Sequence, residues 1–274
     1  MSAPGQGAAA PDRKTRGRTS RERLRALDAY LCHQEPALLT REDGAWAEAA
    51  FVDVGFGEHP FTTLESAQAF RALLPALRVV GVELDAARAA AAAAAHGDAR
   101  THFRQGGFAL AAGERARLVR AMNLLRSYPA EQVPQAHRLL GEALLPGGLL
   151  VEGSADPEGN ITVAHLLRRE EAGLRREALL FHTDFAHGFA PPLFRDWLPR
   201  DLRRRVRPGE AIHAFLAAWT AAWQQVRAEG AGAPPEAFAR SAGLLAARTD
   251  GVCTEPWLLV NGYLRWAPPG GVAA

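Results

Sequence analysis

Two glycines and two acidic residues stand at the ends of neighbouring apolar runs. The segment Asp53 to Gly57 (DVGFG) follows the apolar residues that begin at Ala50, and Glu83 ends a second run that begins at Arg78. Glycines directly after a buried strand allow the backbone to approach a ligand closely. A carboxylate at the end of the next strand can accept two hydrogen bonds from a ribose diol. We therefore expect a nucleoside-like ligand at this position.

The same segment argues against two common nucleotide sites. A dinucleotide fingerprint would continue as G-x-G-x-x-G, but Pro60 occupies the third glycine position. Proline has no N–H and blocks the close helix–strand contact that glycine permits. The sequence also lacks a G-x-x-x-x-G-K-[ST] segment, so neither an NAD or FAD site nor a P-loop is expected.

The elements that would position these residues alternate regularly from residue 50 onward. Regular alternation of strands and helices predicts an α/β fold, a Rossmann-like parallel sheet with helices on both faces. Ligands of such sheets bind beyond the carboxyl ends of the strands. Apolar runs predict strands at 50–54, 78–83, 101–104, 117–122 and 148–152. Helical spacing predicts a helix at 62–77, an alanine-rich helix that follows the second strand and ends at about 96, and a helix at 134–145.

The pattern changes on either side of this region. A first helix is expected at 20–32, and two strands at 161–169 and 175–185 would form an antiparallel pair. Further on, helices are expected at 210–228 and from about 235 to 247, with a strand at 263–266. We predict a disordered basic tail at 1–20, a core at 21–188 that includes the first helix, and a mostly helical extension at 189–274 that caps the ligand site.

Three further segments follow the predicted third and fourth strands and precede the fifth. They read RQGGF at 104–108, AMNLL at 121–125 and LPGGLLV at 145–151. Together with the glycine turn and Glu83, they resemble the class I methyltransferases that use S-adenosylmethionine (SAM), over about Phe51 to Glu152. The chain as a whole resembles an uncharacterised bacterial group of these enzymes. The resemblance implies SAM as cofactor and transfer of its methyl group to an acceptor.

The resemblance also assigns roles to individual residues. An acid that the family usually has near the end of the third strand is replaced here by Gln105 and two glycines. The implied cofactor contacts are Asp53, Gly55 and Gly57 at the methionine and ribose part of SAM, Glu83 at the ribose hydroxyls, Leu84 and Phe108 on either side of the adenine with Gly107 beside them, and Asn123 at the methionine end.

His59, directly after the glycine turn, has two interpretations. As a catalytic base it would remove a proton from an acceptor hydroxyl or amine. Alternatively, Glu58 and His59 cap a helix that begins near Thr62, beside a Thr62/Glu65 capping box. Methyl transfer depends mainly on in-line placement of the reactants, so a base is not compulsory.

Three residues are candidates for the acceptor pocket. Tyr128 would stack on a planar substrate or pack at a helix end; the segment before it lacks the proline pair typical of nucleic-acid amino-methyltransferases. His182 and Asp184 share one face of a strand, but a third metal ligand is missing, so pocket lining is favoured over a metal site. Trp219 lies on an apolar helical stripe that forms either the core or a wall of the pocket.

Charge does not point strongly to nucleic acid. The chain has 32 basic and 30 acidic residues, and Lys14 is its only lysine, a bias typical of GC-rich genomes. RNA remains an alternative partner because of the basic segment 13–25 and the arginines at 200–207. A small apolar or aromatic acceptor is preferred, and a non-catalytic module that binds or senses SAM is the third alternative.

The sequence gives less information on localisation and assembly. Cys32 and Cys253 are far apart, which gives neither a disulfide framework nor a zinc or iron–sulfur site. The sequence shows neither a long apolar span nor a secretory signal, so we expect a cytoplasmic protein that does not enter membranes. The oligomeric state does not follow from the sequence.

Overall fold

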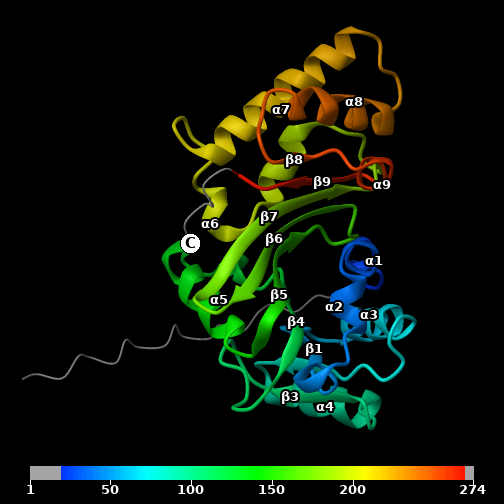
Figure 1. The fold of residues 1–274 in the computed structure, drawn as a ribbon, viewed down its shortest axis with the longest axis vertical. Helices are drawn as coiled ribbons and strands as arrows, with labels where there is room; N and C mark the ends of the chain where they lie inside the picture. The colour runs from blue at the N-terminus through cyan, green and yellow to red at the C-terminus, as the bar shows by residue number, and fades with distance from the viewer. Residues whose placement is uncertain (1–19, 269–274) are drawn as a thin grey trace, which may run out of the picture.

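A mixed β-sheet runs the length of the molecule. The computed structural model describes residues 20–268, so the predicted tail lies outside the described residues apart from Ser20. Within this range nine strands pair in the order β3-β2-β1-β4-β5-β6-β7-β9-β8. Figure 1 shows β3 at one end of the molecule and helices α7 and α8 at the other.

The first half of the sheet is parallel and confirms all five predicted strands. Because β1 lies between β2 and β4, the strand order reverses there, which is the topological switch point of a Rossmann-like fold. We call the side on which these strands end the carboxyl edge. The strands are β1 (Ala50–Val54), β2 (Val79–Glu83), β3 (Thr101–Gln105), β4 (Ala116–Met122) and β5 (Leu144–Ala155).

The second half of the sheet is antiparallel. The predicted hairpin is confirmed as β6 (Ile161–Glu170) and β7 (Gly173–Thr183). The predicted strand near the C-terminus is confirmed as β9 (Tyr263–Trp266), which pairs with β7 on one side and with β8 (Val252–Cys253) on the other. The helical extension therefore contributes two strands to the same sheet as the core.

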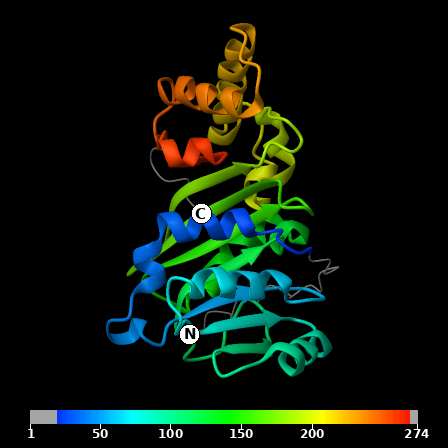
Figure 2. The ribbon, with the colours of Figure 1, turned by 90° about the vertical axis from the view of Figure 1, so that its right-hand side faces the viewer.

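One face of the sheet, the α1 face, is covered by the N-terminal helices (Figure 2). Helix α1 begins at Arg25, later than expected, and α3 ends before residue 77 because Pro75 and its neighbours leave the helical conformation. The helices of this side are α1 (Arg25–Gln34), α2 (Pro36–Thr40), the 3-10 turn η1 (Gly44–Trp46), α3 (Phe61–Arg71) and α4 (Ala86–His96), joined from the C-terminal part by α9 (Pro256–Val260).

The opposite face, the α5 face, carries the remaining helices. Helix α5 is shorter than predicted because Leu144 and Leu145 already belong to β5. The elements of this side are η2 (Leu125–Ser127), η3 (Ala130–Gln132), α5 (Val133–Gly141), η4 (Pro191–Trp197), α6 (Arg200–Arg203), α7 (Ala211–Ala228) and α8 (Pro234–Ala246). Among the described residues, no helix has both the length and the apolar character needed to cross a membrane.

Candidate functional site

The glycine turn after β1 has the backbone that only glycine adopts easily. Gly55 and Gly57 have φ angles of +78° and +85°, in the region that L side chains rarely occupy. The Gly55 N–H donates to the carbonyl of Val82 at 2.7 Å. A Cβ on Gly55 would lie 2.9 Å from Cδ1 of Leu124. The turn is therefore held between the ends of β2 and β4.

Glu83 lies at the end of β2 and meets this turn. Its Oε2 accepts the Gly57 N–H at 2.9 Å and its Oε1 accepts the Asp85 N–H at 3.2 Å. The residue is only 2% exposed, and no cation of the described part of the chain forms an ion pair with it. A carboxylate has about four acceptor positions, so Glu83 keeps acceptor capacity for a ligand.

The predicted adenine side lies beyond the ends of β2 and β3. Phe108 is buried and packs at an angle against Tyr128, with ring centroids 5.1 Å apart. Gln105 donates its amide to the carbonyl of Leu84 at 3.3 Å. At the position where an acid was expected, the side chain therefore ties the β2 and β3 ends together, while Gly107 and Leu84 are half-buried beside it.

Asn123 follows β4 and joins it to β5. Its φ angle is +60°, a left-handed conformation that asparagine tolerates better than most residues. Its N–H donates to the carbonyl of Gly153 at 2.7 Å, and its Oδ1 accepts the N–H of Ala155 at 3.1 Å. Asn123 therefore fixes the carboxyl edge next to the switch point.

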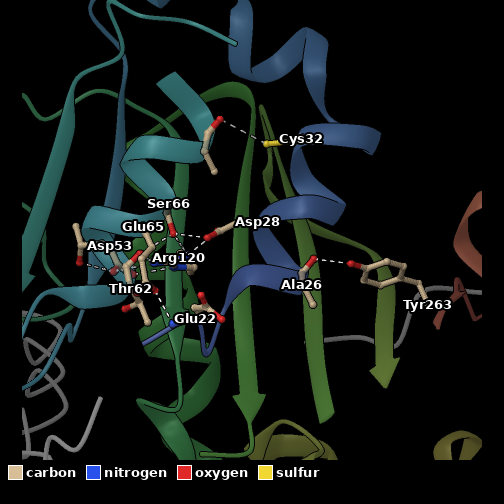
Figure 3. Close-up of polar contacts among 12 residues, drawn as sticks. Glu22, Ala26, Asp28, Cys32, Asp53, Thr62, Glu65, Ser66, Arg120 and Tyr263 are labelled. Carbon is tan, nitrogen blue, oxygen red and sulfur yellow. Dashed lines mark hydrogen bonds and ion pairs between the residues drawn. The ribbon is translucent and has the colours of Figure 1, made fainter. Parts of the chain in front are cut away.

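Asp53 is bound within the protein by Arg120 (Figure 3). Arg120 of β4 donates to both of its carboxylate oxygens at 2.9 Å, and the Thr63 hydroxyl donates to Oδ2 at 2.6 Å. Both residues are almost completely buried. Asp53 therefore holds β1, β4 and α3 together, and its predicted cofactor contact stays a prediction.

Sequence reasoning missed the partners of Asp53. Arg120 also donates to Asp28 of α1 at 2.9 Å and to the Ser66 hydroxyl at 2.6 Å. Burial raises the pKa of Asp28 to about 7, although Arg120 and Ser66 act in the opposite direction. A signal was available, because an arginine inside a predicted buried strand requires an acid or carbonyl partner.

His59 is exposed on the glycine turn. Its ring stacks on that of Phe61, with centroids 5.1 Å apart. The predicted capping arrangement is wrong: the N-cap of α3 is Pro60, and its side chain caps nothing. Glu65 instead accepts the N–H of Glu22 at 2.8 Å. Glu58 and His59 therefore do not cap α3. The role of His59 as a catalytic base stays a prediction.

The three predicted acceptor residues lie in different places. Tyr128 is buried near the carboxyl edge, where its carbonyl accepts a hydrogen bond from Arg200 at 2.6 Å. His182 lies beside Tyr263, and burial lowers its pKa to about 4. Trp219 is completely buried among phenylalanines and donates to Ser241 at 3.1 Å, so its stripe is core. Only Tyr128 lies with the predicted cofactor residues.

The arginines at 200–207 are largely paired. Arg205 and Arg207 bind Glu210, and Arg203 binds Asp196 at 3.4 Å. Such pairs reduce the positive charge that a phosphate backbone would meet.

Comparison with known proteins gives distant structural likenesses. No family model and no curated protein matches the sequence. Similar solved structures include mitomycin 7-O-methyltransferase MmcR, 19% identical over 46% of this chain and 36% of that chain, with a TM-score of 0.32. CcbJ methyltransferase from Streptomyces caelestis is 21% identical over 59% and 64%, with a TM-score of 0.34. Magnesium protoporphyrin IX methyltransferase from Synechocystis, with bound S-adenosylhomocysteine (SAH), is 18% identical over 47% and 53%, with a TM-score of 0.35.

The matched part covers less than two thirds of each of these three structures. The identities and TM-scores are low, so these likenesses do not by themselves assign a function.

Proposed function

We propose that the protein is a SAM-dependent methyltransferase that acts on a small-molecule acceptor. The cofactor would lie across the carboxyl edge at the switch point, between the glycine turn and the loop that follows β4. Glu83 carries this proposal, because it is a buried carboxylate held by two backbone N–H groups without a cation. Buried carboxylates are normally paired with a cation, so the free acceptor positions of Glu83 suit the two hydroxyls of a ribose.

The other predicted cofactor residues fit the group in different ways. Gly55 and Gly57 offer a backbone that a ligand can approach, and Phe108 offers an apolar wall. Asn123 uses its N–H and Oδ1 within the protein, and Asp53 uses both oxygens. We infer that these two residues position the edge, whereas Glu83 and the turn make the direct contacts.

The chemistry requires little of the side chains. When bound, SAM supplies an electrophilic methyl group on its sulfonium. The protein then has to hold the acceptor in line with that group and exclude water, which supplies much of the rate through proximity. His59 lies on the turn at the edge of this site and is the candidate for accepting a proton from the acceptor.

The direct test is calorimetric titration with SAM and with SAH. We expect micromolar binding by the native protein and a loss of roughly tenfold or more in Glu83→Gln, because charge-assisted hydrogen bonds contribute about 1.5–3 kcal/mol. Glu142→Gln is the matched control, since Glu142 is exposed at the C-terminal end of α5 and its side chain pairs with Arg138. Equal affinity of the Glu83 and Glu142 variants, or no binding by folded protein at millimolar ligand, would sink the proposal.

A SAM-binding module without methyl transfer is the second candidate. The exposed position of His59 favours it, because the ring of this candidate base stacks on Phe61. The two candidates are separated by labelled methyl transfer from SAM into extracts of small molecules.

We further propose a cytoplasmic location, since Cys32 and Cys253 are both free thiols.

A further inference from the structure

Arg126 stands at the carboxyl edge, in the turn η2 that follows β4. Its guanidinium lies over the ring of Trp197, 4.5 Å from the ring centroid. The side chain is half-buried, and it makes neither an ion pair nor a hydrogen bond to another residue of the described range 20–268. A guanidinium stacked on an indole is oriented by it while its N–H groups stay available at the rim.

Two further arginines lie within electrostatic reach of Arg126. Arg23 crosses the end of β5 and donates to the carbonyls of Ala155 and Asp156 at 2.7 and 2.8 Å. Burial and the charge of Arg126 lower the pKa of Arg23, and burial and the charge of Arg203 lower the pKa of Arg126. Burial is the larger cause in both cases, so Arg23 and Arg126 lie in a partly desolvated place beside the proposed cofactor site, where a bound anion would favour their charged forms.

The neighbouring acids limit the charge of that anion. Asp156 and Glu158 act on Arg23, and Asp196 acts on Arg126 and pairs with Arg203. These carboxylates would repel a doubly charged phosphate about twice as strongly as a singly charged carboxylate group, and a carboxylate group matches the planar fork of one guanidinium.

We propose that Arg126, oriented by Trp197 and assisted by Arg23, binds a carboxylate group of the methyl acceptor. The substrate class of the site is therefore a small carboxylic acid, and the half-buried ring of Trp197 favours an aromatic one. This inference rests on the proposed methyltransferase function, because it places the acceptor beside the SAM site.

The test uses 4-hydroxybenzoate as the probe and 4-hydroxybenzamide as its uncharged counterpart. Both are titrated by ligand-observed NMR into the full-length protein saturated with SAH. The carboxylate of SAH then already occupies the cofactor site, so the benzoate cannot take its place there. We expect the benzoate to bind about tenfold more tightly than the amide. Inorganic phosphate is added as a competitor and should not displace the benzoate at equal concentration.

Three variants sharpen the test. Arg126→Gln should lose about tenfold in affinity for the benzoate and keep its affinity for SAH within about twofold. Trp197→Leu should weaken benzoate binding, and Trp197→Phe should restore most of it because a ring is present again. Arg204→Gln is the matched control, since Arg204 is exposed at the end of α6. Thermal melting confirms that each variant is folded.

The outcomes separate the two proposals. Equal benzoate affinity in the native protein and Arg126→Gln overturns the inference, as does displacement by phosphate. Loss of SAH affinity in Arg126→Gln also overturns it, because the recognised carboxylate would then belong to the cofactor. If the native protein does not bind SAH, the proposed function fails by that measurement, whatever the benzoate titration gives.

Discussion

Two buried polar networks lie on opposite faces of the sheet. The Arg120 network on the α1 face consists of Asp28, Asp53, Thr63, Ser66 and Arg120. The His165 network on the α5 face consists of His137, Glu152, His165, Arg176 and Asp201. The first joins helices α1 and α3 to the parallel strands, and the second joins α5 and α6 to β5, β6 and β7.

The networks differ in how completely their polar groups are satisfied. Arg120 makes five hydrogen bonds, which equals the number of its N–H donors, and one cation serves two acids. His165 binds Asp201 through Nε2 at 2.9 Å, but its Nδ1 has no partner within the described residues. Asp201 is also 18% exposed at its side chain. The difference indicates that the buried acids of the α1 face depend on Arg120 alone for their counter-charge. On the α5 face the contacts are shared among several residues.

Removing the central cation should have the largest effect. Arg120→Met leaves the buried carboxylates of Asp53 and Asp28 without a counter-charge, and we expect a loss of about 3–5 kcal/mol in the free energy of unfolding. Urea denaturation measures it. Arg138→Met, at an exposed ion pair on α5, is the control and should change stability by less than about 0.5 kcal/mol. A cost below about 1 kcal/mol for Arg120→Met would mean that the α1 face does not depend on this residue.

A matched change in the other network should cost less. Burial alone would raise the pKa of Asp201, but His165 and Arg176 outweigh it and hold that pKa well below its usual range. Asp201→Asn removes the charge that these groups stabilise, and we expect a loss of about 1–3 kcal/mol at pH 7. Asp196→Asn, at a largely exposed acid nearby, is the control. If Asp201→Asn destabilises the protein more than Arg120→Met, the comparison between the two faces is reversed.

The last prediction is a pH dependence in the Arg120 network. The folded pKa of Asp28, about 7, lies above its unfolded value, so the folded state binds the proton more tightly. The resulting stabilisation is fully present below the unfolded pKa and is lost as the pH rises through about 7. Relative to the native protein, Asp28→Asn should therefore gain stability between pH 5 and pH 8. Urea titrations at pH 5, 6, 7 and 8 measure the difference; a constant difference would contradict the shift.

The order of strands and helices followed from local patterns. Apolar runs of strand length and helical spacing do not depend on distant residues, so the five parallel strands, the hairpin β6–β7 and the long helices were predictable. The pairing of β9 with β7 was not, because a four-residue strand carries no information about its neighbour. The ends of helices were also shifted, since Pro75 and the start of β5 compete with the helical pattern.

The candidate site also has parts that the sequence predicted and parts that it did not. The sequence by itself determined the glycine turn and the position of Glu83, because a positive φ requires glycine and a strand end fixes where the acid lies. Only the tertiary structure decided that Asp53 binds Arg120, 67 positions away, and that Arg126 stacks on Trp197. The physical reason is that a buried or stacked charge is defined by its partners in space, which the folding of the whole chain brings together.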